Sequence, residues 1–286
     1  MQGLYYYKGE YKETMKTKIT VAVDNIGIDN LCGEWGLCLY IEYGDTKILA
    51  DSGQSDLFLK NLESMGIDVK DIDYATLSHA HYDHANGMPY FFEANSKAKF
   101  YLRDAAEENA YKKVWILKKY IGLPKHILKT YPDRIVKVSG DYKLTEGVYL
   151  IPHKTPGLEA IGKREKMLLK TKKGWKPDDY SHEQSLVLDT DKGLVIINCC
   201  SHGGVINIIN EVRATFPDKH VYGIIGGFHL FNKSEEEIRT LGKKIKETGI
   251  DYVCTGHCTG GRAYRILKEE LGDKANQLKV GLTMEF

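Results

Sequence analysis

The segment LSHAHYDH, residues 77–84, carries the strongest indication of fold and function in the chain. It follows directly on an apolar run with the composition of a buried strand. Alternate residues of a strand share a face, so the extended start of the segment places His79 and His81 on one side. As the chain bends toward the next helix, Asp83 and His84 face an adjacent position. We therefore predict a centre of two metal ions with these four side chains as ligands.

Two further apolar runs end in loops that combine a histidine with small residues. They are LVIINCCSHGG, residues 194–204, and YVCTGHCTGG, residues 252–261. Glycine permits close backbone approach, which leaves the imidazoles of His202 and His257 room to reach a metal ion. We predict both as further ligands. A third loop of this kind ends at His229, which we expect to face the substrate or to support a ligand, with a packed core histidine as the alternative.

Together with Asp51 in the segment ILADSG, residues 48–53, these motifs resemble the metallo-β-lactamase superfamily in type and order. The resemblance covers nearly the whole chain. It implies an α/β fold, a four-layer αββα sandwich with the metal site at one edge between two mixed β-sheets. It also implies that Asp51 is a buried anchor for the ligands found at residues 79–84.

More narrowly, the motifs CSHGG, GGFHL and GHCTG, which begin at residues 200, 226 and 256, resemble the branch of dihydropterin-linked ribofuranosylaminobenzene phosphate synthases. Two positions depart from the superfamily pattern. Leu158 follows Thr-Pro-Gly where many members have a ligand histidine, and the segment 198–201 replaces the usual bridging aspartate. We assign His202 to one of these gaps. Cys200, as a thiolate, and Glu183 remain alternatives for the other.

The predicted function is a metal-dependent hydrolase that uses a dinuclear centre of two divalent ions to activate water. Zinc is the first choice, and iron or manganese are alternatives because imidazole and carboxylate ligands suit all three. Asp83 and His229 are the predicted catalytic residues: Asp83 orients the attacking water or accepts its proton, and His229 protonates the leaving group or binds the substrate anion. The expected substrate is a small anionic molecule, a phosphate or another ester.

Three other functions remain open. The branch resemblance implies a phosphoribosyl-type transferase in pterin-related biosynthesis, and the same ligands would suit an iron-binding redox protein. A metal-binding sensor without turnover is the third. Local pairs of cysteines raise the question of an iron–sulfur cluster, but their spacing matches neither common ferredoxin pattern, so we expect free thiols. These pairs are Cys32 and Cys38, Cys199 and Cys200, and Cys254 and Cys258.

Composition restricts the partners and the location. The chain has 40 Lys and Arg against 39 Asp and Glu, so its net charge of +1 gives no general attraction to nucleic acid. It contains no apolar run of a length that spans a bilayer, and we expect no membrane partner. Six cysteines and a start without an apolar signal core predict a reducing cytoplasm. Oligomeric state is left open.

The predicted organisation is one domain, residues 15–286, preceded by a disordered leader at residues 1–14. A basic insertion near residues 155–183 is proposed as a lid, with Lys172 and Lys173 recruiting anions. Strands and helices alternate in both halves of the chain. The expected strands are 19–23, 36–43, 47–50, 72–77, 100–102, 186–188, 194–198, 221–225 and 252–255, and the expected helices are 54–65, one from about 86, 105–121, one after 204, and 235–248.

Overall fold

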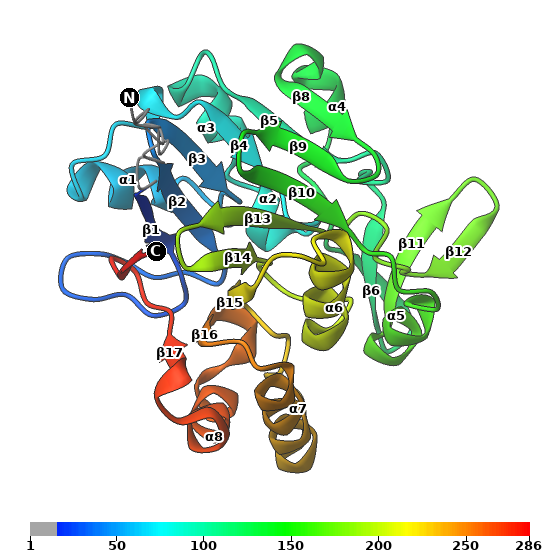
Figure 1. Cartoon of the computed structure of the whole chain (residues 1–286). Helices are drawn as coiled ribbons and strands as arrows, with labels where there is room; N and C mark the ends of the chain where they lie inside the picture. Colours follow the sequence, from blue (N-terminus) through cyan, green and yellow to red (C-terminus); the bar gives the residue numbers. More distant parts are fainter. Residues whose placement is uncertain (1–15) are drawn as a thin grey trace, which may run out of the picture.

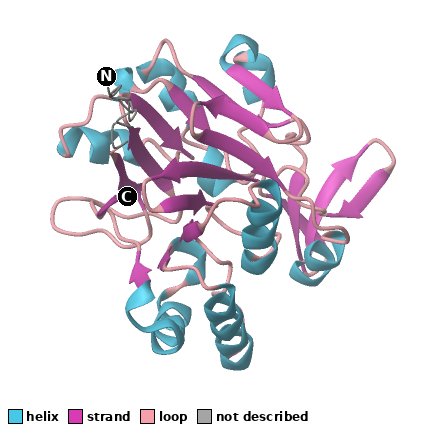
Figure 2. Cartoon of the chain, in the orientation of Figure 1, coloured by secondary structure: helices cyan, strands magenta, loops and turns pink. Residues whose placement is uncertain are grey.

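The computed structural model describes residues 16–286, and the predicted leader at residues 1–14 lies outside the described residues. Two seven-stranded sheets lie against each other, and a four-stranded sheet stands beside them (Figures 1 and 2). In spatial order, the first sheet consists of β18 (Thr283–Glu285), β1 (Thr17–Val23), β2 (Cys38–Tyr43), β3 (Thr46–Ala50), β4 (Tyr74–Thr76), β5 (Lys99–Arg103) and β8 (Ile135–Val138).

The second sheet is built in the same mixed way. In spatial order it consists of β17 (Ala275–Gln277), β16 (Tyr252–Thr255), β15 (Val221–Gly226), β14 (Gly193–Ile197), β13 (Gln184–Thr190), β10 (Val148–Pro152) and β9 (Tyr142–Thr145). Each sheet has an antiparallel part and a parallel part. The parallel strands are β3, β4, β5 and β8 in the first sheet, and β14 to β17 in the second.

Apolar side chains fill three layers between and outside the two sheets. Ile19, Ile41 and Val195 belong to the cluster between the sheets. Phe58 of α1 (Leu57–Ser64) and Phe91 of α3 (Met88–Ala94) pack on the outer face of the first sheet. On the outer face of the second sheet lie α6 (Val205–Thr215), α7 (Glu235–Thr248) and α8 (Gly261–Leu271). This arrangement confirms the predicted four-layer αββα sandwich.

Parallel strands position the predicted ligands. The carboxyl ends of parallel strands meet at one edge of a sheet. In the first sheet, β3 and β4 end just before Asp51 and His79; in the second, β14 and β16 end just before Cys200 and His257. Because the two sheets face each other, the four loops meet at one edge. The short helix α2 (Tyr82–Ala85) then carries the rest of the residue 77–84 motif.

The predicted helix at residues 105–121 is wrong. The chain there forms β6 (Ala110–Val114) and β7 (Leu117–Tyr120), joined by a two-residue turn with Trp115 at φ 55°. Helix-forming residues around Ala105 suggested the helix, but β6 pairs with β11 (Met167–Thr171), and this tertiary pairing overrides local propensity. With β12 (Gly174–Pro177), these strands form the small sheet, which we call the arm.

The other predicted elements fall close to those observed, including α7, which begins with a capping box of Ser234 and Glu237. Short helices complete the fold: α4 (Ile127–Thr130) and α5 (Glu159–Glu165).

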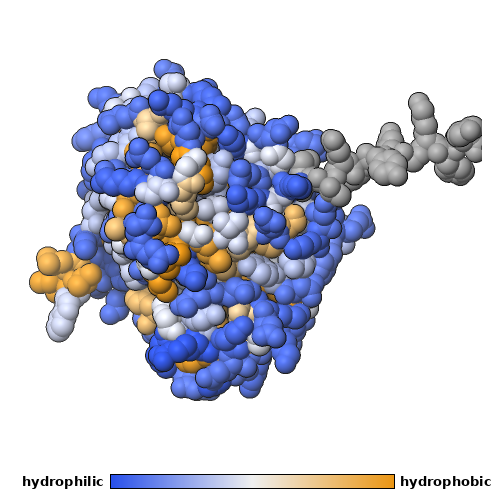
Figure 3. Space-filling view, turned by 90° about the vertical axis from the view of Figure 1, so that its left-hand side faces the viewer, coloured by the Kyte–Doolittle hydropathy of each residue, from blue (hydrophilic) through white to orange (hydrophobic). Residues whose placement is uncertain are grey.

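Figure 3 shows a largely hydrophilic surface with apolar areas and one apolar projection. Trp115 and Ile116, at the turn of the arm, are 90% and 89% exposed. Among the described residues, no helix is long and apolar enough to cross a membrane.

Candidate metal centre

Asp51 anchors two of the predicted ligands. Its carboxylate is fully buried and accepts hydrogen bonds from the Ser78 backbone N–H and hydroxyl, each at 2.6 Å. His84 Nδ1 lies 2.6 Å from the same carboxylate, and the Ser78 hydroxyl lies 2.9 Å from His79 Nδ1. Because a carboxylate only accepts, the proton of His84 sits on Nδ1. The Ser78 hydroxyl, already donating to Asp51, accepts from His79 Nδ1, so the Nε2 atoms of both histidines are free to bind a metal ion.

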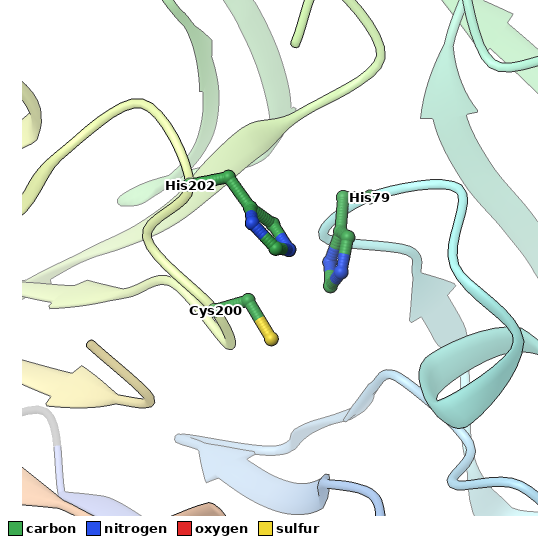
Figure 4. A group of neighbouring side chains, drawn as sticks. All are labelled: His79, Cys200 and His202. Atoms are coloured by element: carbon green, nitrogen blue, oxygen red, sulfur yellow. The ribbon is translucent and has the colours of Figure 1, made fainter. Parts of the chain in front are cut away.

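Three histidines converge on one side of the site. His79, His81 and His202 have ring centroids 4.6 to 4.8 Å apart. Their Nε2 atoms are buried without a hydrogen-bond partner among the described residues. Figure 4 shows His79, from the loop after β4, and His202 and Cys200, from the loop after β14, pointing toward one another. Buried polar atoms are rarely left unpaired, so three such nitrogens on neighbouring rings fit a cation. The ligand atoms of His79 and His202 lie within 4.8 Å of each other and of the Cys200 sulfur, whereas His81 falls in a set with Asp178 and His182.

A second group of predicted ligands lies directly beside the first. His84 Nε2 is 3.1 Å from His257 Nε2, and Asp83 Oδ2 is 3.4 Å from His257 Nε2. His257 is held from behind, because its backbone N–H donates to Asp24 at 2.8 Å and its Nδ1 lies 3.1 Å from the Asn25 side-chain oxygen. The structure thus brings together all six residues that the sequence predicted as ligands.

Cys200 lies between the two groups. Its sulfur is 3.2 Å from His84 Nε2, and its ligand atom falls within 4.8 Å of those of three sets: His79 with His202, His84 with His257, and His229 with Cys258. The sulfur is thus within reach of both groups. Burial, reinforced by Cys258, raises the pKa of the Cys200 thiol, so binding as a thiolate would require a metal ion to displace the proton. The geometry therefore favours Cys200 over Glu183 for the place of the missing bridging aspartate.

Glu183 contacts the backbone of the loop that carries His202. Its carboxylate accepts the backbone N–H groups of His202 and Gly203 at 2.9 and 2.8 Å, and also contacts His153 Nε2. His153 in turn contacts Glu211, 2.9 Å from its Nδ1. Burial lowers the pKa of His153, but the two carboxylates outweigh it and raise that pKa to about 10. Glu183 thus holds the loop that carries His202 and has no oxygen aimed at the ligands.

His182 and Asp178 form a second buried pair, which the sequence did not predict. His182 Nδ1 accepts the backbone N–H of Ala80 at 3.1 Å, and its Nε2 lies 3.0 Å from the Asp178 carboxylate. Ala80 stands between two ligands, so this pair fixes the backbone of the ligand segment. His153, Asp178 and His182 lie in or beside the stretch interpreted as a basic insertion, and no periodicity in the sequence marks them.

The site is electrostatically prepared for a cation. Burial, reinforced by the neighbouring imidazoles, holds the pKa of His79 and of His202 well below the usual histidine range. Burial also lowers the pKa of His81 to about 3. Burial alone would raise the pKa of Asp83, but the adjacent His84 and His257 lower it overall. Metal ligation requires neutral imidazoles and an ionised carboxylate, the states favoured at these four residues. At His84 burial lowers the pKa, but the carboxylates of Asp83 and Asp51 outweigh it and raise that pKa to about 9, so a metal ion bound there would displace a proton.

Several residues with strained backbone conformations lie in the loops of the candidate site. Asp51, Ser201, His229 and His257 all have positive φ, between 47° and 60°. Non-glycine residues adopt this region at a cost, and such outliers cluster at active sites where the surrounding structure fixes them. The strain therefore supports a functional role for these loops.

The ligands open into a cavity of about 270 Å³. His229 lines it, and neither ring nitrogen of His229 has a hydrogen-bond partner among the described residues. Lys172 and Lys173, predicted to recruit anions, do not line this cavity. The other residues lining it are Trp35, His81, Tyr82, Asp83, Lys112, Val114, Lys119, Ile121, Met167, Cys200, His202, Phe231 and Cys258.

Comparison with known proteins agrees with this geometry. The family model described as the metallo-beta-lactamase superfamily matches residues 36–203. The 7,8-dihydropterin-6-methyl-4-(beta-D-ribofuranosyl)-aminobenzene-5'-phosphate synthase of Methanocaldococcus jannaschii is 29% identical over 287 residues, 93% of this chain and 95% of the relative. The resemblance stated from the motifs is thereby confirmed.

Solved structures show the same fold. Tm1679, described as a metal-dependent hydrolase of the beta-lactamase superfamily, superposes with a TM-score of 0.79 at 28% identity, covering 94% of this chain and 99% of that one. A diphosphatase from the PhnP family gives a TM-score of 0.57 at 14% identity, covering 95% and 98% of the two chains. The second likeness shows the fold alone.

Proposed function

The chain belongs to the metallo-beta-lactamase superfamily, and from this premise we propose that it is a metal-dependent hydrolase with a dinuclear centre. His79, His81 and His202 would hold one divalent ion, and Asp83, His84 and His257 the other. Cys200 would contribute to both. The observation that carries the proposal is the position of the Cys200 sulfur between two sets of converging histidines.

The ligand set favours zinc, with iron and manganese as alternatives. Imidazole suits all three, but a thiolate is a soft ligand that selects zinc or iron over manganese. When bound, such ions lower the pKa of a coordinated water toward ~7 and polarise the substrate oxygen. The donor set of this chain fits that chemistry, because the pKa values of His79, His81 and His202 are lowered, which favours neutral imidazoles, and Asp83 is ionised.

Two residues of the chain would handle protons during hydrolysis. Asp83, ionised and lining the cavity, is placed to orient the attacking water or accept its proton. His229 lines the cavity, and its two ring nitrogens have no partner within residues 16–286, so we assign it to protonate the leaving group or bind the substrate anion. We propose a small phosphorylated or other ester as the substrate.

The transferase alternative has support of its own. A relative aligned over almost the whole chain is named a synthase, and its name contains a phosphate. A transferase would use the same residues but would keep water out of the site, so that a second organic substrate accepts the transferred group. Product analysis separates the two, because a hydrolase needs no second organic substrate. Visible absorbance of freshly purified protein would reveal iron-based redox chemistry.

The first test is the metal content of protein purified without added metal, measured by element for wild type and His81→Ala. We expect about two equivalents in the wild type and a sharp fall in the variant. Wild-type protein that binds no metal even after reconstitution would overturn the proposal. Equal metal content in the two proteins would remove His81 from the ligand set.

A further inference from the structure

One face of the arm forms a wall of the metal cavity. Side chains of a strand alternate between its two faces, so Lys112 and Val114 of β6 share a face. Lys119 of β7 and Ile121 lie on this same face, and all four side chains line the cavity. Lys113 and Lys118 point to the opposite face, where the Lys118 ammonium lies 4.8 Å from the ring centre of Trp175.

Lys112 and Lys119 are direct cross-strand partners in the hairpin. Side chains at such positions lie close together, and like charges directly opposite destabilise a sheet. Neither lysine makes an ion pair with any residue in the described range 16–286. The arm, residues 110–120 and 167–177, contains eight lysines and no acidic residue, so the neutralising charge is not supplied by the arm itself.

The Lys112 ammonium stands near the site residues across the cavity. It lies 5.9 Å from the centre of the Phe231 ring, which in turn lies 5.1 Å from the His229 ring. Phe231 also meets Trp35 edge to face, with centroids 5.9 Å apart. These two rings are 45% and 38% exposed and belong to the cavity wall. The lining of the cavity thus combines cationic side chains of the arm, the neighbouring aromatic rings of Trp35 and Phe231, and candidate metal ligands such as His81 and His202.

We propose that Lys112 and Lys119 bind a phosphate group of the substrate that is not itself cleaved, while Trp35 and Phe231 contact an aromatic or other apolar body. The chemistry at the other end of such a substrate rests on the proposed hydrolase function. A phosphate monoester carries close to two negative charges near neutral pH, which two neighbouring ammonium groups match. This assignment moves anion recruitment from Lys172 and Lys173 to the hairpin of β6 and β7.

The hairpin supplies its own matched control. Replacing Lys112 and Lys119 with serine removes two charges from the cavity face, whereas replacing Lys113 and Lys118 removes the same charge from the opposite face. At ~0.15 M salt the Debye length is about 8 Å, so general attraction by the arm is largely screened. A difference between the two double variants therefore reports direct contact.

The experiment measures binding of phenyl phosphate to the metal-loaded protein by calorimetry at ~0.15 M salt. We expect Lys112→Ser/Lys119→Ser to weaken binding at least tenfold and Lys113→Ser/Lys118→Ser to change it less than twofold. Lys112→Arg/Lys119→Arg, which keeps both charges, should restore binding to within a few-fold. Equal weakening in both serine variants, no weakening in the first, or no binding of phenyl phosphate at all would overturn the proposal.

Failure of the subsite and failure of the hydrolase function give different results, because binding by calorimetry and hydrolysis, followed as release of phenol or 4-nitrophenol, are measured separately. Lysine-dependent binding of phenyl phosphate in a protein that hydrolyses no ester would leave the subsite and remove the hydrolase. Metal-dependent hydrolysis of a neutral ester such as 4-nitrophenyl acetate, with phenyl phosphate binding unaffected by the cavity-face lysines, would do the reverse.

Discussion

Replacing Asp51 with asparagine should weaken metal binding while leaving the fold in place. The Asp51 carboxylate accepts three hydrogen bonds of 2.6 Å, from the Ser78 backbone, the Ser78 hydroxyl and His84 Nδ1. An asparagine oxygen can still accept from the Ser78 backbone N–H, which fixes the orientation of the amide. The amide NH₂ then faces His84 Nδ1 and the Ser78 hydroxyl, where the wild type has an acceptor.

This reversal changes the tautomers of two ligands. His84 Nδ1 must now accept, so its proton moves to Nε2, the atom that points at His257. The Ser78 hydroxyl accepts from the amide and donates to His79 Nδ1, which sends the His79 proton to Nε2 as well. A proton on Nε2 excludes a metal ion, and restoring the other tautomer leaves two donors facing each other.

Loss of such an outer hydrogen bond costs about 10- to 100-fold in metal affinity. That range corresponds to about 1.4 to 2.8 kcal/mol per ion. Both groups of ligands contain one of the affected histidines, so both ions should bind more weakly. Because hydrogen bonds to a charged group contribute about 1.5 to 3 kcal/mol, the metal-free variant should also unfold about 2 to 4 kcal/mol more easily.

The assay is competition for zinc against a chromophoric chelator, with urea unfolding of the metal-free protein measured in parallel. Asp251→Asn is the control, because Asp251 forms a similar contact with His220, at 2.8 Å, on the surface away from the site. We expect the control to match the wild type in both measurements. Zinc affinity within twofold of wild type in Asp51→Asn would refute the tautomer argument.

Three further outcomes follow from the same geometry. Cys200→Ala should reduce bound metal below two equivalents while Cys200→Asp retains it, as measured by elemental analysis; full occupancy in the alanine variant would exclude a shared sulfur. Gly203→Ala should destabilise the protein by about 1 to 3 kcal/mol in urea, because a Cβ there would meet the His153 ring at 2.2 Å, whereas Gly261→Ala, with open space around it, should be neutral. The pKa of His153 is raised to about 10, so its contribution to stability is complete below the unfolded value of ~6.5 and is lost as pH rises toward 10; His153→Gln should flatten this alkaline loss in pH-dependent unfolding.

Local sequence was sufficient to select the candidate ligands that the structure brings together, and to predict the strands that precede them. An apolar strand that runs into closely spaced histidines predicts both a buried strand and a site at its end, because period-two alternation and ligand chemistry are local properties. The periodicity of apolar residues, also a local property, predicted the helix at residues 235–248, which are the observed bounds of α7. The motif order also sufficed for the family, since it preserves which strand precedes which ligand.

Tertiary structure decided what depends on partners distant in the chain. The hairpin of β6 and β7 exists because β11, more than 40 residues later, pairs with it, and local propensity had favoured a helix. The chemistry of its carboxylate made Glu183 a candidate ligand. In the structure its oxygens contact the His202 backbone and His153, and not the candidate metal ligands. The sequence also could not show which lysines of the hairpin face the cavity. Alternation along a strand determines which residues share a face, but only the tertiary structure determines which face is turned toward the candidate metal ligands.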